Sequence, residues 1–274
     1  MMRALLLIAL LLASSTASAG AYVEMAQKDL DDASAKPKTN KLWTDTGKLR
    51  LDMEEGKNSV IFKNETMYAV DHPNKRVSVI DKQTMEQVGA QMKQMQAQMQ
   101  ERMAQMPPEQ RAQVEKMMAQ HGGMGAMGNT PPAPPPRVFK QTSRTEQVAG
   151  KPCTIWEVSE SGAKVEEMCV APMSTVNGGT EVLAALKDLG KMFEGLSQQM
   201  GGGTRDRMTQ SWRELDQVKG FPVLTRDFEN GKAKREQRLV TSRTEPVPAA
   251  SFDPPADYKT ERPQMPGQPP QKTK

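Results

Sequence analysis

Short segments in which hydrophobic and polar residues alternate dominate residues 41–80 of this 274-residue chain. The clearest is Lys48–Met53 (KLRLDM), where Leu49, Leu51 and Met53 fall on one face of an extended strand. The runs NSVIFK, TMYAV and RVSVI follow after turns of only a few residues. Connections this short join antiparallel neighbours, so the pattern predicts a four-stranded meander.

From Thr84 onward the hydrophobic positions follow each other at intervals of three or four residues, which predicts an amphipathic helix. Thr84 and Gln87 have the spacing of a capping box, so we expect the helix to begin there. Pro107 ends it, and a second short helix is expected up to residue 120. The stripe of the first helix consists of Met85, Val88, Met92, Met95, Met99, Met103 and Met106.

Three segments have compositions that predict no fixed structure. Residues 121–136 (HGGMGAMGNTPPAPPP) are rich in Gly and Pro and are expected to be a disordered linker. Residues 20–40 are polar and rich in Lys, Asp and Ala, which predicts a flexible lead-in, with a first helix as the alternative. Residues 260–274 consist mainly of Pro, Gln and Lys, which predicts a disordered tail. The part expected to fold is therefore 41–259, with a Met-rich helical insert over 84–120.

Strand signals return in the second half of the chain, over 137–148 and through CTIWEVSESGAKVEEMC. A helix is expected from Thr180 to the Gly-rich stretch 201–203, and Asn230-Gly231 is a strong signal for a two-residue hairpin. Strands on both sides of the helices indicate one antiparallel sheet with helices covering one face, an α+β domain. The insert and the linker then interrupt a single domain; two independent domains are the alternative.

The first 19 residues have the pattern of a secretory signal peptide. Arg3 precedes the hydrophobic run ALLLIALLLA, and Ala17-Ser18-Ala19 is a small-residue cleavage site. The run is too short to span a membrane as a helix. We therefore expect a mature protein without a transmembrane segment, located in the periplasm of a Gram-negative bacterium.

The two cysteines, Cys153 and Cys169, are expected to form a disulfide in such an oxidising compartment. A hairpin with a three-residue loop ending at Gly162 places them directly opposite each other. The bond would close a loop of about 15 residues and contribute about 3 kcal/mol to the free energy of unfolding. A reactive or metal-binding thiol pair is the alternative.

The remaining composition argues against catalysis and against nucleic-acid binding. The formal net charge is only +4, and basic and acidic residues are interspersed, so we expect no nucleic-acid partner. The two histidines, His72 and His121, lie in a turn and at the edge of the linker. The sequence has no HExxH or GxSxG motif. We therefore expect neither an enzyme nor a cofactor.

The stretch GKLRLDMEEGKNSVIFKNETMYAVDHPNKRVSVID resembles the opening meander of bacterial periplasmic lipoprotein-carrier-like proteins. VAGKPCTIWEV, EEMCVAP and the closing VPAASFDPPADYK resemble an uncharacterised secreted family of unknown function. The resemblance implies a half-barrel, in which a curved antiparallel sheet lidded by helices holds acyl chains in its hollow. It covers roughly residues 42–259 without the insert and the linker, and it implies no individual site residue.

The methionine stripe has two interpretations that agree with such a fold. It can bury against the concave face of the sheet, because methionine fills irregular space well. It can also form an adaptable apolar surface for acyl chains or unfolded protein segments. We therefore expect a non-enzymatic binding protein for a lipid, a lipopeptide or an apolar protein segment. The candidate apolar-ligand surface consists of Met92, Met95, Met99, Met103 and Met106.

Copper is the alternative ligand, because soft thioethers select Cu(I). Met124 and Met127 lie in the linker, where no core explains them. The candidate metal ligands are His121, Met124, Met127, Met117 and Met118. A structural envelope protein without a small ligand is a third possibility.

Overall fold

The computed structural model describes residues 20–262 with the exception of 33, 108, 111–134 and 200–216. Twelve strands form one sheet in the order β12-β6-β5-β4-β3-β2-β1-β11-β10-β9-β8-β7. All neighbours are antiparallel except β12 and β6, which are parallel. The strands are β1 (Gly20–Asp29), β2 (Lys38–Asp45), β3 (Lys48–Met53), β4 (Asn58–Lys63), β5 (Thr66–Asp71), β6 (Arg76–Ile80), β7 (Arg137–Val148), β8 (Lys151–Glu160), β9 (Ala163–Ala171), β10 (Phe221–Glu229), β11 (Lys232–Glu245) and β12 (Lys259–Glu261).

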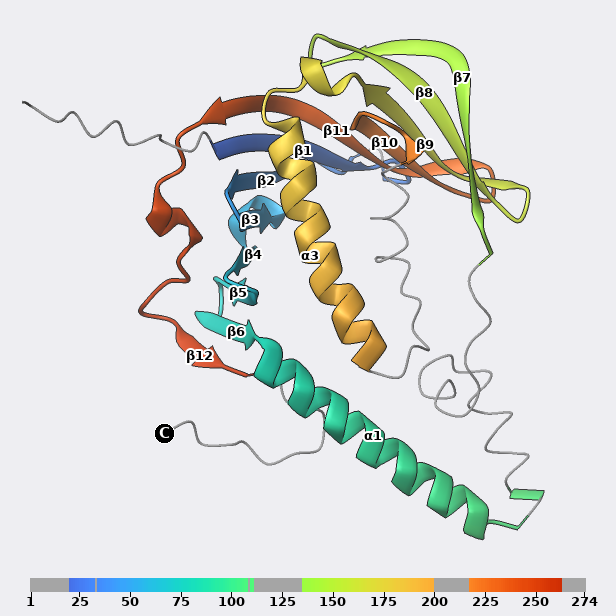
Figure 1. Cartoon of the computed structure of the whole chain (residues 1–274). Coiled ribbons are helices and arrows are strands. Elements are labelled where there is room, and N and C mark those ends of the chain that lie inside the picture. Colours follow the sequence, from blue (N-terminus) through green and yellow to red (C-terminus); the bar gives the residue numbers. More distant parts are fainter. Residues whose placement is uncertain (1–19, 33, 108, 111–134, 200–216, 263–274) are drawn as a thin grey trace, which may run out of the picture.

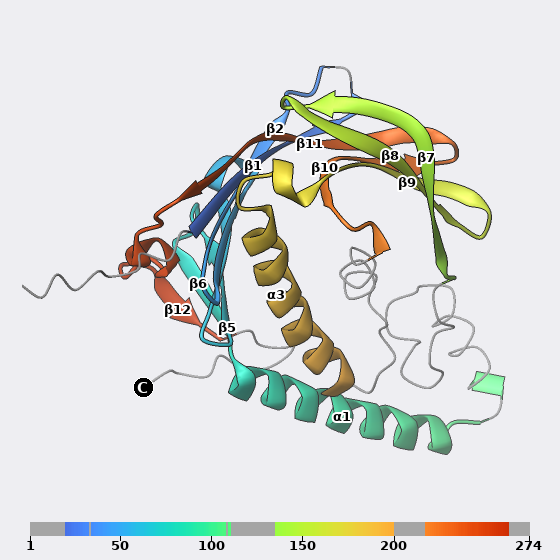
Figure 2. The same ribbon diagram turned by 45° about the horizontal axis from the view of Figure 1, so that its top comes forward.

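The sheet is strongly curved and does not close (Figures 1 and 2). Strand β1 pairs with β11, so the strands before the Met-rich insert and those after it belong to the same sheet. The predicted curved antiparallel sheet is confirmed. The predicted cover of several helices is only partly correct, because α3 (Gly179–Gln199) is the one helix of the described chain that packs on the sheet at length.

The meander β3–β6 follows the predicted strands closely. The flexible lead-in expected at 20–40 is wrong for residues 20–29, which form β1 in the middle of the sheet. Ala21, Tyr22 and Val23 are buried there between β2 and β11, whereas the second half of the strand is polar and hides the strand pattern. The expected disordered tail is wrong at its start, because β12 extends to Glu261 and pairs with β6.

Helix α1 spans Lys82–Gln105 and begins two residues earlier than predicted. Its N-cap is Asp81, whose carboxylate accepts a hydrogen bond from the Thr84 backbone N–H at 2.7 Å. A capping carboxylate satisfies one of the free N–H groups of the first turn, so Thr84 lies inside the helix and is not its cap. The remainder of the expected insert beyond 110 and the expected linker lie mainly outside the described residues.

Helix α3 lies in the hollow of the curved sheet (Figure 2) and contacts β1, β2 and β3. Val182, Ala185 and Leu189 form its buried face, at the three- and four-residue intervals of an amphipathic helix. These side chains belong to the main hydrophobic core, together with Val23 and Leu49 of the concave face. The helix thus occupies the position that one interpretation gave to the methionine stripe.

A second core lies on the opposite, convex face. Phe252, from the short 3-10 helix η5 (Ala249–Phe252), is fully buried against Ile61, Val70 and Val77. The C-terminal segment therefore crosses the convex face of β3–β6 before β12 joins the edge of the sheet (Figure 1).

Candidate functional site

The two cysteines form the predicted disulfide between β8 and β9, with an S–S distance of 2.05 Å and a Cα–Cα distance of 5.3 Å. The predicted register is wrong. Cys169 pairs with Ile155, because the turn has two residues and a β-bulge at Val165, opposite Val158 and Ser159, shifts the pairing. A bulge adds one unpaired residue to a strand, and the alternation of residue types does not reveal it. Both Cys153 and Cys169 are buried.

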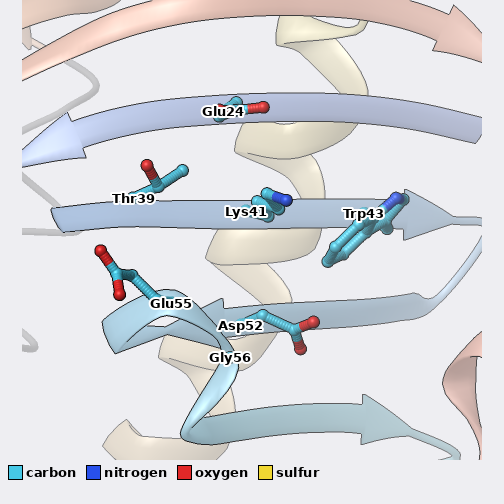
Figure 3. A pocket seen from close by; sticks show the side chains of 7 residues that line it. All are labelled: Glu24, Thr39, Lys41, Trp43, Asp52, Glu55 and Gly56. Carbon is cyan, nitrogen blue, oxygen red and sulfur yellow. The ribbon is translucent and has the colours of Figure 1, made fainter.

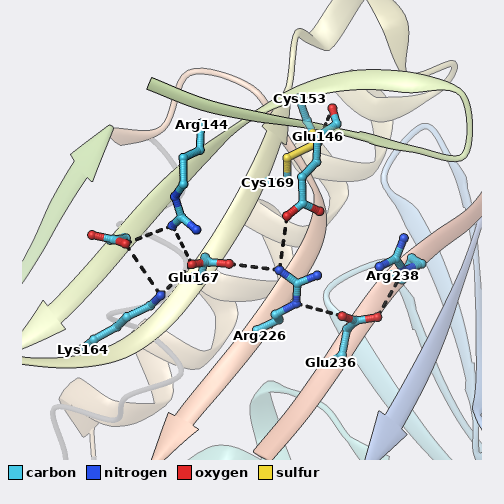
Figure 4. A network of polar contacts seen from close by, with 10 residues as sticks. Arg144, Glu146, Cys153, Lys164, Glu167, Cys169, Arg226, Glu236 and Arg238 are labelled. Carbon is cyan, nitrogen blue, oxygen red and sulfur yellow. Dashed lines mark hydrogen bonds and ion pairs between the residues drawn. A yellow bond between two sulfur atoms is a disulfide. The ribbon is translucent and has the colours of Figure 1, made fainter. Parts of the chain in front are cut away.

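A row of charged side chains crosses four strands beside the disulfide (Figure 4). The members of the row are register partners and therefore lie on one face of the sheet: Glu157, Glu167, Arg226 and Glu236. Glu167 is only 4% exposed and accepts hydrogen bonds from Lys164 at 2.6 Å, Arg144 at 2.7 Å and Arg226 at 3.0 Å.

These contacts determine the protonation of Glu167. Burial alone raises the pKa of its carboxyl group, but the hydrogen bonds from Lys164, Arg144 and Arg226 outweigh burial and lower the pKa to about 2. Arg226 is shared with Glu236, at 2.8 Å. Since the acids and bases of this network neutralise each other, we assign it to the stability of the sheet and not to ligand binding.

The convex face carries a pocket of about 420 Å³ over β1, β2 and β3 (Figure 3). Its lining combines one aromatic ring, one hydroxyl, one amine and three carboxylates: Glu24, Thr39, Lys41, Trp43, Asp52, Glu55 and Gly56. Glu24, Lys41 and Asp52 are register partners across the three strands. Helix α3 lies behind the strands in this view, so the pocket faces away from it.

A chain of hydrogen bonds continues from the pocket into the sheet. Asp52 accepts a hydrogen bond from the Ser59 hydroxyl at 2.7 Å, and Ser59 Oγ lies 2.8 Å from His72 Nε2. Serine beside histidine is also the arrangement of a nucleophile and its base. Ser59 is 1% exposed, however, so a substrate carbon cannot reach its hydroxyl in this conformation. The contact is therefore structural.

The predicted apolar-ligand residues lie on α1, which runs along the open end of the hollow and mainly contacts α3 and β6 (Figure 2). Met95, Met103 and Met106 are half-buried, and none of them belongs to the hydrophobic cores that the described residues form. The side chains of Met92 and Met99 are not among the parts of the chain that the structure describes. The stripe therefore does not extend the core beneath α3 at the positions that the structure describes.

The predicted copper ligands, His121, Met124, Met127, Met117 and Met118, all lie outside the described residues. Within the described ranges, no group of three or more His, Cys, Asp or Glu side chains is placed to hold a metal ion. No helix of the described chain is both long and apolar enough to cross a membrane.

Sequence reasoning missed the convex pocket and the His72 contacts. The pocket residues alternate with the buried residues of β2, so Lys41 and Trp43 read as the outer face of a strand. No local signal indicated that three such outer faces, together with Glu55, form a hollow.

Comparison with known proteins identifies one family model. A model described as "Domain of unknown function (DUF4412)" matches residues 82–258, which is more than half of the chain. Among curated proteins, no sequence matches.

Several solved structures match this chain at very low sequence identity and with TM-scores below 0.5. An uncharacterised conserved protein from Thermus thermophilus has 6% identity and a TM-score of 0.44, over 90% of this chain and 91% of that chain. The MucA/MucB complex from Pseudomonas aeruginosa gives 11% identity and a TM-score of 0.38, over 93% of this chain and 62% of the matched one. A LolA superfamily protein from Nitrosomonas europaea gives 7% identity and a TM-score of 0.30, over 86% of this chain and 90% of that chain.

Proposed function

The chain belongs to the family of the domain of unknown function DUF4412, and we propose that it is a non-enzymatic binding protein for an apolar ligand. Membership in a family of unknown function was expected from the cysteine hairpin and the closing VPAASFDPPADYK. The proposed ligand is a lipid acyl chain, a lipopeptide or an apolar segment of another protein. The proposed site is the α1–α3 side of the curved sheet.

The placement of the methionine-bearing face of α1 is the observation that carries this proposal. Helix α3 already packs over β1–β3, and α1 runs along the open end of the hollow (Figure 2). Met95, Met103 and Met106 of α1 are half-buried and lie outside the cores that the described residues form. Flexible thioethers suit a surface that must adapt to ligands of varied shape. The opposite side of α1 carries exposed polar residues such as Gln94 and Gln105.

The location that we propose is the periplasm. A buried disulfide persists in oxidising compartments and is rare in the cytosol, and the Cys153–Cys169 bond fits this pattern. The signal peptide expected at residues 1–19 supports the same location but lies outside the described residues.

The experiment is native mass spectrometry of the mature protein purified gently from periplasm, followed by titration with a fluorescent fatty acid. We expect a co-purified apolar mass, and at least a tenfold weaker fatty-acid affinity in Met95→Gln/Met103→Gln. The matched control is Gln94→Ala/Gln105→Ala, which changes the exposed face of the same helix and should leave the affinity unchanged. A bare protein that binds no fatty acid would contradict the proposal and favour a structural role in the envelope. A co-purified peptide mass would identify a protein segment as the ligand.

The Cu(I) site stays a prediction from the sequence. The same mass spectrum of protein from copper-supplemented cells tests it. One or more bound copper ions that are lost in Met124→Leu/Met127→Leu would support it.

A further inference from the structure

We propose that the pocket on the convex face binds a neutral oligosaccharide. This inference does not rest on the proposed function, because the pocket lies on the face of the sheet opposite to α3. Its volume of about 420 Å³ falls in the range of roughly 300–1,000 Å³ that small-molecule sites have.

The rigid groups of the pocket are each held by a neighbour outside it. Glu24 accepts a hydrogen bond of 2.5 Å from the Tyr22 hydroxyl. Burial and this hydrogen bond raise the pKa of Tyr22 above its usual value, so the hydroxyl keeps its proton and continues to donate. Asp52 is held by two hydrogen bonds from Arg50, at 2.8 and 3.2 Å, and by Ser59. Side chains whose orientation is fixed before binding lose little entropy when a ligand arrives.

Trp43, the aromatic residue that lines the pocket, is also held in place by its neighbours. The ring centroids of Trp43 and Tyr22 lie 5.2 Å apart. The Arg50 guanidinium lies 5.8 Å from the centroid of the Trp43 ring. Trp43 remains half-exposed at the rim of the pocket (Figure 3). An indole combines a flat apolar surface with a polar N–H group, which suits a ligand with apolar C–H faces and polar edges, such as a pyranose ring.

Two further groups of the pocket have their hydrogen-bonding capacity available. Lys41 lies between its register partners Glu24 and Asp52, yet in the described chain it forms no ion pair with either. Glu55 is exposed and likewise forms no ion pair or side-chain hydrogen bond with the described residues. Lys41 offers three donors and Glu55 offers acceptors, and both are charged and therefore form strong hydrogen bonds.

The charges narrow the class of ligand. The pocket holds three carboxylates, and Lys41 and Arg50 offset two of them. A phosphate or another strongly anionic ligand would meet net repulsion, and a cation would meet Lys41 in the centre of the pocket (Figure 3). A neutral ligand rich in hydroxyl groups can donate to the carboxylates and accept from Lys41 at the same time. An oligosaccharide meets these requirements.

The test is calorimetric titration of the mature protein with two trisaccharides, chitotriose and maltotriose. Tryptophan fluorescence is recorded in the same titrations. We expect at least one to bind, and the variants Lys41→Met and Glu55→Gln to weaken binding at least tenfold. Both side chains are exposed and have no partner in the described chain, so the fold should be unaffected. Trp43→Phe should remove the fluorescence change. The matched controls are Lys38→Met and Glu65→Gln, which are exposed residues of the same types outside the pocket.

Three outcomes would overturn the proposal. One is a dissociation constant weaker than about 10 mM for both trisaccharides. Another is binding that Lys41→Met and Glu55→Gln leave unchanged, which would place the sugar elsewhere. The third is binding of spermidine in place of the trisaccharides, which would make the pocket a site for cationic ligands.

Discussion

His72 Nδ1 lies 3.0 Å from the hydroxyl oxygen of Tyr258, although 186 residues separate the two in the chain. His72 in turn contacts Ser59, so a continuous set of hydrogen bonds joins the C-terminal segment to β4 and β3. Phe252 is anchored on the same face of the sheet. The C-terminal segment is thereby held to the convex face by both polar and apolar contacts.

Replacing Tyr258 by Phe tests the polar contact. The variant keeps the ring and removes the hydroxyl, so His72 loses one hydrogen-bond partner in a half-buried site. We expect the free energy of unfolding to fall by about 1 kcal/mol in urea denaturation. The control is Asp257→Asn, which removes the ion pair with Lys75. Both side chains of that pair are more than 60% exposed, so its loss should change stability little. Equal effects of the two variants would contradict the proposed anchoring.

The free energy of unfolding should depend on pH through the carboxyl group of Glu167. Its pKa is lowered from 4.5 to about 2 in the folded chain, so its contribution is fully present above about pH 4.5 and is lost as the pH falls toward 2. Glu167→Gln leaves Lys164, Arg144 and Arg226 without their shared carboxylate. We expect a loss of about 2–4 kcal/mol near pH 7, measured by urea unfolding.

The difference in stability between wild type and Glu167→Gln should shrink as the pH falls from 4.5 to 2. Glu157→Gln is the matched control, because Glu157 bonds Arg144 in the same network but is 39% exposed. Its effect should be clearly smaller. A difference between wild type and Glu167→Gln that stays constant down to pH 2 would show that the carboxylate is not held in its charged form.

Gly178 fixes the start of α3 against β1. Its φ is +74°, and a Cβ atom at this position would lie 2.3 Å from the Cβ of Ala21. Gly178→Ala therefore combines a left-handed conformation with a clash against a strand at the centre of the sheet. We expect a loss of about 3 kcal/mol, measured by thermal unfolding. Gly231→Ala has nearly the same φ, +77°, but no atom within 4 Å, so it should cost only about 1 kcal/mol. Similar losses in both variants would show that the contact with Ala21 relaxes freely.

The sequence predicts those parts of the fold that are encoded locally. The meander β3–β6, helix α3 and the hairpin at Asn230-Gly231 are each specified by residues that are neighbours in the chain. Strand β1 was missed because its partner β11 lies more than 200 residues away and because Glu24 and Lys28 make its outer face polar. A strand in the centre of a sheet with one exposed face carries only half of the hydrophobic signal.

The candidate sites follow the same rule. The Cys153–Cys169 pair was predicted from two strands and a turn, but the bulge at Val165 was not, because it depends on how β9 fits its neighbours. The convex pocket needs β1, β2, β3 and the turn at Glu55 together. Its residues have no hydrophobic period of their own, so only the three-dimensional register brings them together.

The disulfide gives the last prediction. The two cysteines are 16 residues apart, so the double variant Cys153→Ala/Cys169→Ala should lose about 3 kcal/mol through the greater entropy of its unfolded chain. For a chain of this size each kcal/mol lowers Tm by roughly 2–4 °C, so we expect Tm to fall by about 6–12 °C.

Burial of the bond provides the control for that experiment. Because Cys153 and Cys169 are at most 3% exposed, dithiothreitol can reduce them only when this part of the sheet opens. Reductant added to the native protein at room temperature should act slowly, whereas reductant added after unfolding should prevent the wild type from regaining its full Tm. The double variant should respond to neither treatment. Rapid reduction of the native protein would show that β8 and β9 open far more readily than their burial indicates.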